Sequence, residues 1–301
     1  AASDINTANK VTSVNTNDTV YLGYIGVHTG DINGFFIWKK VSLGGIDDLN
    51  PEMVISDYIY DDGKSSPVKF QVVSDHLLLA GTKQRIIADL FKLHPHGIVY
   101  AGNVNGFAQV ALALGAKMTG SSTTILIPKI RPMTSQTQLA LQLGANIIEF
   151  EGREASLDRL RTAAASIATK SGMWMPKLGF ESDEFRTLMH NAIVSRLPKG
   201  FDRLRKWSVW VVGGSGTLAL TLHDVFSNSI INVVSVGKKI DWHFRGLDRI
   251  RLHIAPQRFS EEVSGDQLPP YPSVKSYDAK VWQFVKKNFN SRDPILIWNV
   301  A

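Results

Sequence analysis

The hydrophobic and polar positions of residues 97–172 follow two alternating patterns. Short, continuous apolar runs indicate strands, and longer stretches with apolar residues at every third or fourth position indicate helices. The predicted strands are 97–102, 123–128 and 146–151, and the predicted helices are 105–118, 135–144 and 156–170. Strands that alternate with helices of this length predict right-handed βαβ units and a parallel sheet.

A second stretch of the same kind follows residue 182. It begins with a predicted helix at 183–196 and ends with a Pro-rich loop, a helix at 277–289 and a strand at 294–300. The elements between them are strands at 207–212, 230–236 and 249–255 and a helix at 216–226. Towards the N-terminus, residues 19–42 predict two strands joined by a Gly/Asp/Asn turn, and 68–74 predicts another strand.

These patterns predict an α/β protein with two three-layer α/β lobes and mostly parallel sheets. We expect a small α/β domain at 97–172, inserted into a large domain made of 68–96 and 173–301. Residues 1–67 are expected to form an arm and strands that pack on the large domain. Ligands of open α/β sheets bind outside the carboxyl ends of the strands, so the turns after the strands are the candidate sites.

Composition narrows the class of protein. The chain has 301 residues, of which 44% are hydrophobic and 20% charged, as in an ordinary globular protein. No apolar run approaches the roughly 20 residues of a membrane span, and we expect no secretory signal and a cytoplasmic location. The absence of cysteine excludes disulfides, thiolate metal ligands and a cysteine nucleophile.

The net charge of +6 is concentrated in two segments. Residues 196–206 carry five basic residues and one acid, and residues 238–258 carry six basic residues and two acids. Such clusters attract polyanions, although most charge runs are simply solvated faces. Modified DNA is therefore a candidate partner through clusters 196–206 and 238–258.

The turn after strand 207–212 has the clearest chemistry. Gly213, Gly214, Ser215, Gly216 and Thr217 lie between the strand and an apolar-periodic helix. Glycines let a backbone approach an anion closely, and the free N–H groups at a helix N-terminus favour negative charge. The segment is predicted to hold a phosphate group; the alternative is a plain glycine turn with a threonine cap.

Other phosphate motifs fit this turn less well. Gly214, Gly216 and Ala219 match a dinucleotide fingerprint, but the next strand ends in Gly237, Lys238 and Lys239 rather than in the acid that holds a ribose. An NADP-binding oxidoreductase therefore stays an alternative, and an NAD site is excluded. No Gly-Lys-Ser/Thr follows the glycines, and Thr217 stands where a nucleophile elbow needs glycine.

Three further turns carry polar candidates. Residues 80–85, AGTKQR, place Lys83 directly before a predicted helix, where a positive charge opposes the helix dipole. Asn103 and Asn105 lie between a strand and a helix, where asparagine is most often a cap. Asn299 lies in the strand at 294–300. Lys129 and Lys280 are interpreted as surface residues, and Lys83 is favoured over both because neither follows a turn of this type.

The order of these four turns resembles the fold-type II, or tryptophan-synthase-β-like, family of pyridoxal-phosphate enzymes. The segment SDHLLLAGTKQR is similar to the lysine turn of the aminocyclopropane-carboxylate deaminase and D-cysteine desulfhydrase branch, GNVNGFAQVALALGA to its asparagine loop, and GGSGTL to its phosphate loop. The resemblance covers residues 68–301. The short GTKQR form also resembles pyridoxal-phosphate enzymes of phage DNA hypermodification, which act on amino acids attached to thymine.

The resemblance implies a role for each candidate. It implies pyridoxal 5′-phosphate as the cofactor, Lys83 as the Schiff-base lysine, Asn105 at the phenolic oxygen of the cofactor, residues 213–217 at its phosphate and Asn299 at its ring nitrogen. Thr82, Gln84 and Asn103 are expected to contact an amino-acid-type substrate, and no metal is expected. The helix dipole would lower the pKa of such a lysine amine, which a reactive amine requires.

Departures from the family pattern concern the substrate. Val104 and Gly106 replace the family's serine and its histidine or glutamine, and Asn299 replaces a hydroxyl. We therefore expect an altered carboxylate pocket, a mostly neutral ring nitrogen and a lyase step: decarboxylation, deamination or elimination, on a free or DNA-linked amino acid. A homodimer is expected. A non-catalytic nucleic-acid-binding relative is the third alternative.

Overall fold

The computed structural model describes residues 19–23, 27–28, 38–42, 45–61, 63, 66–237, 240–289 and 292–301. The chain forms two compact units, each described here by itself. The first contains Ala1–Ile25, Phe36–Pro51 and Leu79–Ser182, and the second contains Gly26–Phe35, Glu52–Leu78 and Asp183–Ala301. The domain boundaries at residues 97 and 172 stay a prediction from the sequence.

The second unit is built on a six-stranded sheet with the strand order β11-β10-β9-β13-β5-β4. The strands are β4 (Ile55–Tyr60), β5 (Val68–Ser74), β9 (Ser208–Gly213), β10 (Ile230–Ser235), β11 (Ile250–Ile254) and β13 (Ile295–Asn299). All pair in parallel except β4, which runs antiparallel to β5 and was not predicted. The carboxyl ends of the five parallel strands therefore meet at one edge.

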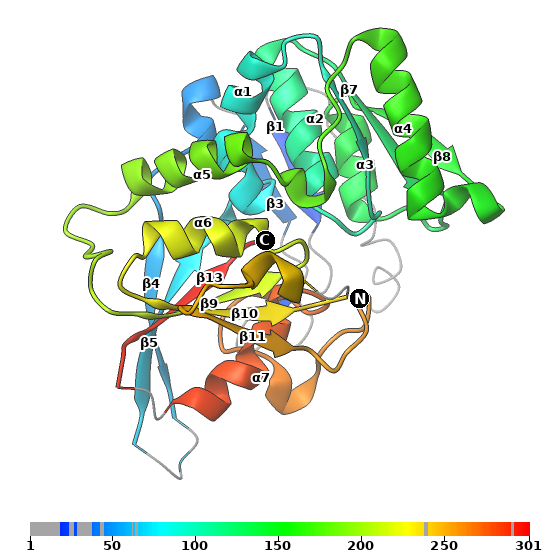
Figure 1. The fold of residues 1–301 in the computed structure, drawn as a ribbon. Helices are drawn as coiled ribbons and strands as arrows, with labels where there is room; N and C mark the ends of the chain where they lie inside the picture. The colour runs from blue at the N-terminus through cyan, green and yellow to red at the C-terminus, as the bar shows by residue number, and fades with distance from the viewer. Residues whose placement is uncertain are drawn as a thin grey trace. The chain divides into compact units, whose positions relative to one another are not determined.

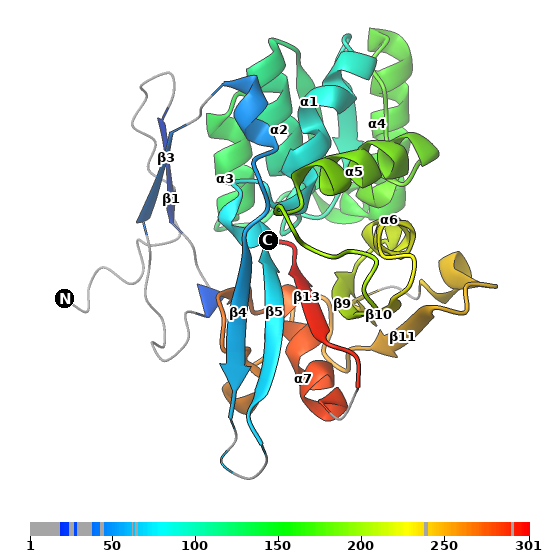
Figure 2. The same ribbon diagram turned by 90° about the vertical axis from the view of Figure 1, so that its left-hand side faces the viewer.

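Helices cover both faces of this sheet. Figures 1 and 2 show α6 (Thr217–Val225) on one face and the short α7 (Trp282–Val285) on the other, and α5 (Asp183–Arg196) packs against α6. Every residue of β9 and β13 is buried, as expected for central strands covered on both sides. The predicted parallel sheet of this part of the chain is confirmed.

The first unit holds a three-stranded parallel sheet, β6-β7-β8. Its elements are α1 (Gln84–Leu93), β6 (Ile98–Ala101), α2 (Ala108–Thr119), β7 (Thr123–Pro128), α3 (Ser135–Gln142), β8 (Asn146–Phe150) and α4 (Leu157–Ser171). Val99 and Ala101 of β6 pack on α4, so the alternate residues of this fully buried strand face the other side. Helix α2 packs against α1 and α3.

Two predicted helices differ from those in the structure. Helix α2 begins at Ala108 rather than at 105, because the preceding residues form a turn of their own. The expected helix at 277–289 is divided into a 3₁₀ turn at Asp278–Val281, α7 and a 3₁₀ turn at Lys286–Asn288. The side chains of Asp278 and Lys280 bind backbone groups outside the helix at its first turn.

Short pairings complete the described fold. β1 (Thr19–Gly23) pairs antiparallel with β3 (Trp38–Ser42), which confirms the two strands predicted within 19–42. The turn predicted between them, and the arm at 1–18, lie outside the described residues. β2 (Val27–His28) pairs with β12 (Ser273–Val274) in the second unit. No helix in the described part of the chain is both long and apolar enough to cross a bilayer.

Candidate functional site

Lys83 lies at the junction of a 3₁₀ turn and helix α1. The turn spans Gly81–Lys83, and Gly81 has a φ of 63°, which favours glycine. This turn and α1 both pack against α2, the helix that follows the asparagine loop. Thr82 is completely buried, whereas Lys83 is half-buried. The first unit therefore brings the lysine turn next to the helix of the asparagine loop.

The side chains of Gln84 and Arg85 hydrogen-bond to groups within the protein, most of them backbone groups. The amide of Gln84 accepts a hydrogen bond from Ala80 N–H and donates one to the carbonyl oxygen of Leu49. Arg85 donates to Asn50 Oδ1 at 2.9 Å and to the carbonyl oxygen of Pro51 at 2.8 Å. Both side chains are buried and hold the 49–51 segment on α1. The substrate contact expected for Gln84 stays a prediction, and its present partners are structural.

The asparagine loop is held by polar side chains from two helices. Asn103 Oδ1 accepts a hydrogen bond from Asn105 N–H at 2.9 Å, so Asn103 forms the turn that presents Asn105. Both asparagines are exposed. The carbonyl oxygen of Val104 accepts from Gln109 Nε2 at 2.7 Å and from Thr134 Oγ1 at 2.8 Å. The loop is thereby anchored at its centre while its asparagine side chains stay accessible.

The predicted phosphate loop lies in the second unit, between β9 and α6, and each of its glycines has a separate structural reason. A Cβ at Gly213 would lie 2.7 Å from a methyl group of Val233 and 2.8 Å from one of Ile240. One at Gly214 would lie 3.0 Å from the Tyr277 hydroxyl oxygen. Gly216 has φ 86°, ψ −9°, a left-handed conformation, and is the N-cap of α6. The three glycine positions therefore place no side chain in the loop.

Hydroxyl groups face each other across this loop. Ser215 Oγ and Thr217 Oγ1 lie 3.1 Å apart, and Thr217 N–H points to Ser215 Oγ at 3.5 Å. The first N–H groups of α6 have no carbonyl four residues earlier to bind, as at any helix start. Hydroxyl donors and backbone N–H groups, in a turn whose other residues are glycines, suit a phosphate group.

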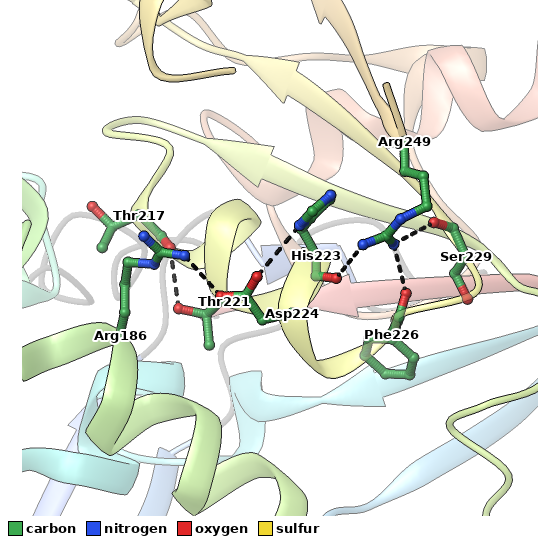
Figure 3. Close-up of polar contacts among 8 residues, drawn as sticks. All are labelled: Arg186, Thr217, Thr221, His223, Asp224, Phe226, Ser229 and Arg249. Atoms are coloured by element: carbon green, nitrogen blue, oxygen red, sulfur yellow. Dashed lines mark hydrogen bonds and ion pairs between the residues drawn. The ribbon is translucent and has the colours of Figure 1, made fainter. Parts of the chain in front are cut away.

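The other end of α6 is closed by an arginine. Figure 3 shows Arg249 donating to three carbonyl oxygens, those of His223, Phe226 and Ser229, at 3.0–3.1 Å. On the side of the helix, Arg186 from α5 donates to Asp224 at 2.7 Å. A cation at the C-terminus interacts favourably with the negative end of the helix dipole, and the positive end lies at the glycine loop.

Asn299 lies at the carboxyl end of β13, beside the β9 strand that leads into the glycine loop. It is buried, and Nδ2 donates to the carbonyl oxygen of Pro272 at 2.7 Å and to His76 Nδ1 at 2.8 Å. Oδ1 accepts from Ser273 Oγ at 3.1 Å. Both amide hydrogens are therefore used within the protein, so in this arrangement only Oδ1 can accept a further hydrogen bond.

Sequence reasoning missed several residues at this strand edge: His76, Ser273, Tyr277 and Asp278. His76 follows β5, whose end pairs with that of β13, and the buried Asp278 accepts hydrogen bonds from the N–H groups of Val300 and Ala301. The rule that ligands bind at the carboxyl ends of strands pointed to His76. The other three lie in or beside the segment 268–277, whose position over the sheet edge no local pattern predicts.

Lys280 is buried, which corrects its interpretation as a surface residue. Its Nζ donates to the carbonyl oxygens of Arg258 and Phe259 at 2.7 and 3.0 Å. Burial lowers the pKa of this amine. A long aliphatic stem within an apolar-periodic stretch allows such burial when carbonyl groups receive the ammonium. Lys280 therefore serves to hold the 258–259 turn.

The basic clusters are partly committed to local contacts. Arg203 donates to the carbonyl oxygen of Val225, Arg249 caps α6, and Arg251 donates to the carbonyl oxygen of Asp248. Lys206 Nζ lies 3.5 Å from Asp293 Oδ2 in an ion pair. Lys238 and Lys239 lie outside the described residues. In the described part of the chain, no group of three His, Asp or Glu side chains is arranged to hold a metal ion.

The fold of this chain is similar to those of several solved structures. No protein-family model matches the sequence, and no curated protein does. A solved ACC deaminase homologue has a TM-score of 0.64 at 15% identity, over 84% of this chain and 90% of its own. A hydrogen sulfide-producing enzyme from Fusobacterium nucleatum has 0.61 at 14%, over 84% and 86%. Threonine deaminase isoform 2 from Solanum lycopersicum has 0.57 at 13%, over 85% and 80%.

At these identities the likeness concerns the fold. The chain has the mixed α/β fold with parallel sheets of the fold-type II pyridoxal-phosphate enzymes, and the predicted fold class is confirmed. The predicted site residues fall into two groups. Lys83, Thr82, Gln84, Asn103 and Asn105 lie in the first unit, whereas Gly213–Thr217 and Asn299 lie in the second.

Proposed function

We propose that this protein is a pyridoxal-phosphate-dependent lyase that acts on an amino-acid-type substrate. The observation that carries the proposal is the glycine loop 213–217, with two hydroxyl groups and the start of α6, in a fold shared with enzymes of this class. A loop whose glycines leave its backbone N–H groups accessible, and whose two hydroxyls are neutral donors, fits a phosphate group. The named neighbours include deaminases and a hydrogen sulfide-producing enzyme, which favours elimination or deamination.

The cofactor, when bound, supplies an electron-withdrawing ring that stabilises negative charge at the substrate Cα. This chain would contribute the remaining functions. Ser215, Thr217 and the N–H groups of the loop would hold the phosphate. Asn105, presented by the Asn103 turn, would orient the ring through its phenolic oxygen. Lys83 would supply the covalent amine, and its Nζ would then carry a proton to or from the substrate Cα.

Asn299 would be the partner of the ring nitrogen. Both amide hydrogens of Asn299 are bound to Pro272 and His76, so the side chain could offer a positive ring nitrogen one hydrogen bond to Oδ1 but no negative charge. We therefore propose moderate electron withdrawal, suited to a lyase step rather than to amino transfer. Decarboxylation, a DNA-linked amino acid as substrate, a homodimer and a cytoplasmic location stay predictions from the sequence.

Lys83→Ala tests the covalent role. The purified protein with added pyridoxal phosphate is expected to show a visible absorption band, and borohydride is expected to fix the cofactor irreversibly on Lys83, located by peptide mass spectrometry. Lys83→Ala should lose both signals. Lys129→Ala is the matched control, because Lys129 is an exposed lysine in an ion pair with Glu151, and it should keep both.

Other results would point to the alternatives. The absence of a band in the unmodified protein would contradict the proposal. Tryptophan quenching by NADP without such a band would support the oxidoreductase alternative, and DNA binding without any cofactor would support the nucleic-acid-binding relative. Label on Lys280 in place of Lys83 would show that the cofactor is right and the lysine wrong.

A further inference from the structure

Phe180 has an unusual backbone for its residue type. Among the described residues it is the only non-glycine with a positive φ, 62°, and it follows Gly179, which has a φ of 68°. Glu181 N–H donates to the carbonyl oxygen of Leu178, so these residues form a turn with two successive left-handed positions. A bulky residue adopts this conformation only where its surroundings impose it, and such positions concentrate at functional sites.

The surroundings that impose it lie in the first unit. The Phe180 side chain is completely buried, and its ring meets that of Tyr100 edge to face, with centroids 5.6 Å apart and planes at 84°. The Gly179 backbone hydrogen-bonds the Tyr100 hydroxyl, while burial raises the pKa of Tyr100 to about 12. A Cβ at Gly102 would lie 2.3 Å from the Tyr100 ring. The Tyr100–Phe180 contact thus joins the turn at 178–181 to the strand that leads into the asparagine loop.

The face of the Phe180 ring lies under Lys83. Lys83 Nζ is 6.0 Å from the ring centroid, the distance at which an ammonium is attracted by the electron-rich face of an aromatic ring. Lys83 and Phe180 are 97 residues apart in the sequence, so the contact depends on the fold. A ring held by a left-handed backbone position and by Tyr100 has little freedom to move away from the amine.

We propose that Phe180 is a positioning residue for Lys83: its ring fixes where the amine lies and favours its charged form. The inference rests on the proposed role of Lys83 as the covalent amine. Such an amine must hold a proton after taking it from substrate. An aromatic face stabilises the resulting ammonium without neutralising its charge, whereas a carboxylate would neutralise it. The titratable or charged groups on the elements next to this contact include Arg85, two residues after Lys83 on α1, Tyr100 on β6, Arg161 on α4, whose charge acts on Tyr100, and Glu181, the residue after Phe180.

The test measures the protonation of Lys83 in the protein without cofactor. Trace labelling with acetic anhydride across pH 7–11, quantified for each lysine by peptide mass spectrometry, gives a midpoint for Lys83 and for the exposed Lys117 as internal standard. In Phe180→Leu the Lys83 midpoint should fall by about half a pH unit, since the charged form loses its ring. Phe180→Tyr keeps the ring and should keep the midpoint. Lys117 should not change.

A second variant separates the effect from any damage to folding. Pentafluorophenylalanine at position 180 keeps the shape of the ring but removes the negative charge of its face, so it should lower the midpoint as Phe180→Leu does, at an unchanged melting temperature. An unchanged Lys83 midpoint in both variants would overturn the proposal. Borohydride trapping on the unmodified protein is a separate measurement. Trapping without a midpoint shift in the Phe180 variants would support the proposed function and contradict the role of Phe180. A midpoint shift without trapping would support the effect of Phe180 on Lys83 and contradict the proposed function.

Discussion

Asn299 shows how one side chain can limit the chemistry of a site. Its amide donates to the carbonyl oxygen of Pro272 and to His76 Nδ1, and its oxygen accepts from Ser273. Pro272 O can only accept, which fixes which amide atom is the nitrogen. His76 Nδ1 must then be the unprotonated ring nitrogen. A buried amide with three partners holds the sheet edge rigidly, because each partner would lose a hydrogen bond if it moved.

Asn299→Asp tests this network. The carboxylate cannot donate to Pro272 or His76 and is buried, so the free energy of unfolding should fall by about 2–4 kcal/mol at pH 8. Burial favours the neutral acid and raises the pKa of the new carboxyl group above its unfolded value. The loss should therefore shrink as the pH falls towards 5, where the folded protein binds the proton more tightly than the unfolded chain.

Urea denaturation at pH 8 and pH 5 measures the difference. Asn288→Asp is the matched control, since it makes the same change at an exposed amide that donates to the Phe284 carbonyl, and it should change stability by less than about 0.5 kcal/mol. An equal loss for Asn299→Asp at both pH values would mean that the new carboxyl group is solvated and the network is not closed.

The lysine turn illustrates what sequence can predict at the scale of residues. Lys83, Gln84 and Arg85 are adjacent, and a motif treats them as one unit. The structure separates them, because Gln84 and Arg85 bind Leu49, Asn50 and Pro51, about 35 residues earlier in the chain. Long-range partners of this kind leave no local pattern, so the sequence indicates the turn but not which of its polar side chains are committed to the backbone.

At the scale of elements, helix α6 is the feature on which the proposed phosphate site depends. The sequence places the glycine turn before α6 correctly, because the requirements for a close strand-to-helix turn are local: no Cβ at Gly213 and a left-handed backbone at Gly216. Its binding of phosphate stays a prediction. The C-terminal cap of α6 was not predicted. Arg249 is 24 residues beyond the end of α6 and was assigned to a basic cluster, since charge patterning alone does not distinguish a cap from a solvated charge.

Arg249→Ala should therefore destabilise the protein through α6. Three charged hydrogen bonds to the carbonyls of His223, Phe226 and Ser229 are lost, which we expect to lower the free energy of unfolding by about 2 kcal/mol. Arg251→Ala removes an exposed arginine from the same cluster and should cost less than about 0.5 kcal/mol. Chemical denaturation compares the two, and equal losses would show that Arg249 is not the cap that matters.

At the scale of the whole molecule, the class of fold followed from the alternation of strands and helices, and the strand order did not. β13 inserts between β5 and β9, and its pairing with β5 joins residues more than 200 positions apart. Apolar periodicity reports that a strand is buried but not which neighbour it pairs with. The antiparallel edge strand β4, ISDYIY, was missed because only part of it is apolar.

The distribution of charge over the molecule leads to a last prediction, about DNA. The net charge of +6 favours association with any polyanion, but Arg203, Arg249 and Arg251 already donate to backbone carbonyls. Exposed members of the 196–206 cluster remain, among them Arg196, Lys199 and Arg205. About four phosphate contacts give a salt dependence with a slope near −3.6, so duplex DNA affinity should fall roughly a hundredfold between 50 and 200 mM salt.

Fluorescence anisotropy with labelled duplex DNA measures this slope. The charge-reversed double variant Lys199→Glu, Arg205→Glu should lose most of the low-salt binding, because two phosphate contacts become repulsive, while trapping of pyridoxal phosphate on Lys83 stays intact. Such weak, salt-sensitive binding is what a basic surface produces without a DNA substrate. Binding that survived at 200 mM salt, or that strengthened with DNA carrying an amino acid on thymine, would instead support the DNA-linked substrate, since recognition of the attached group does not depend on released counterions.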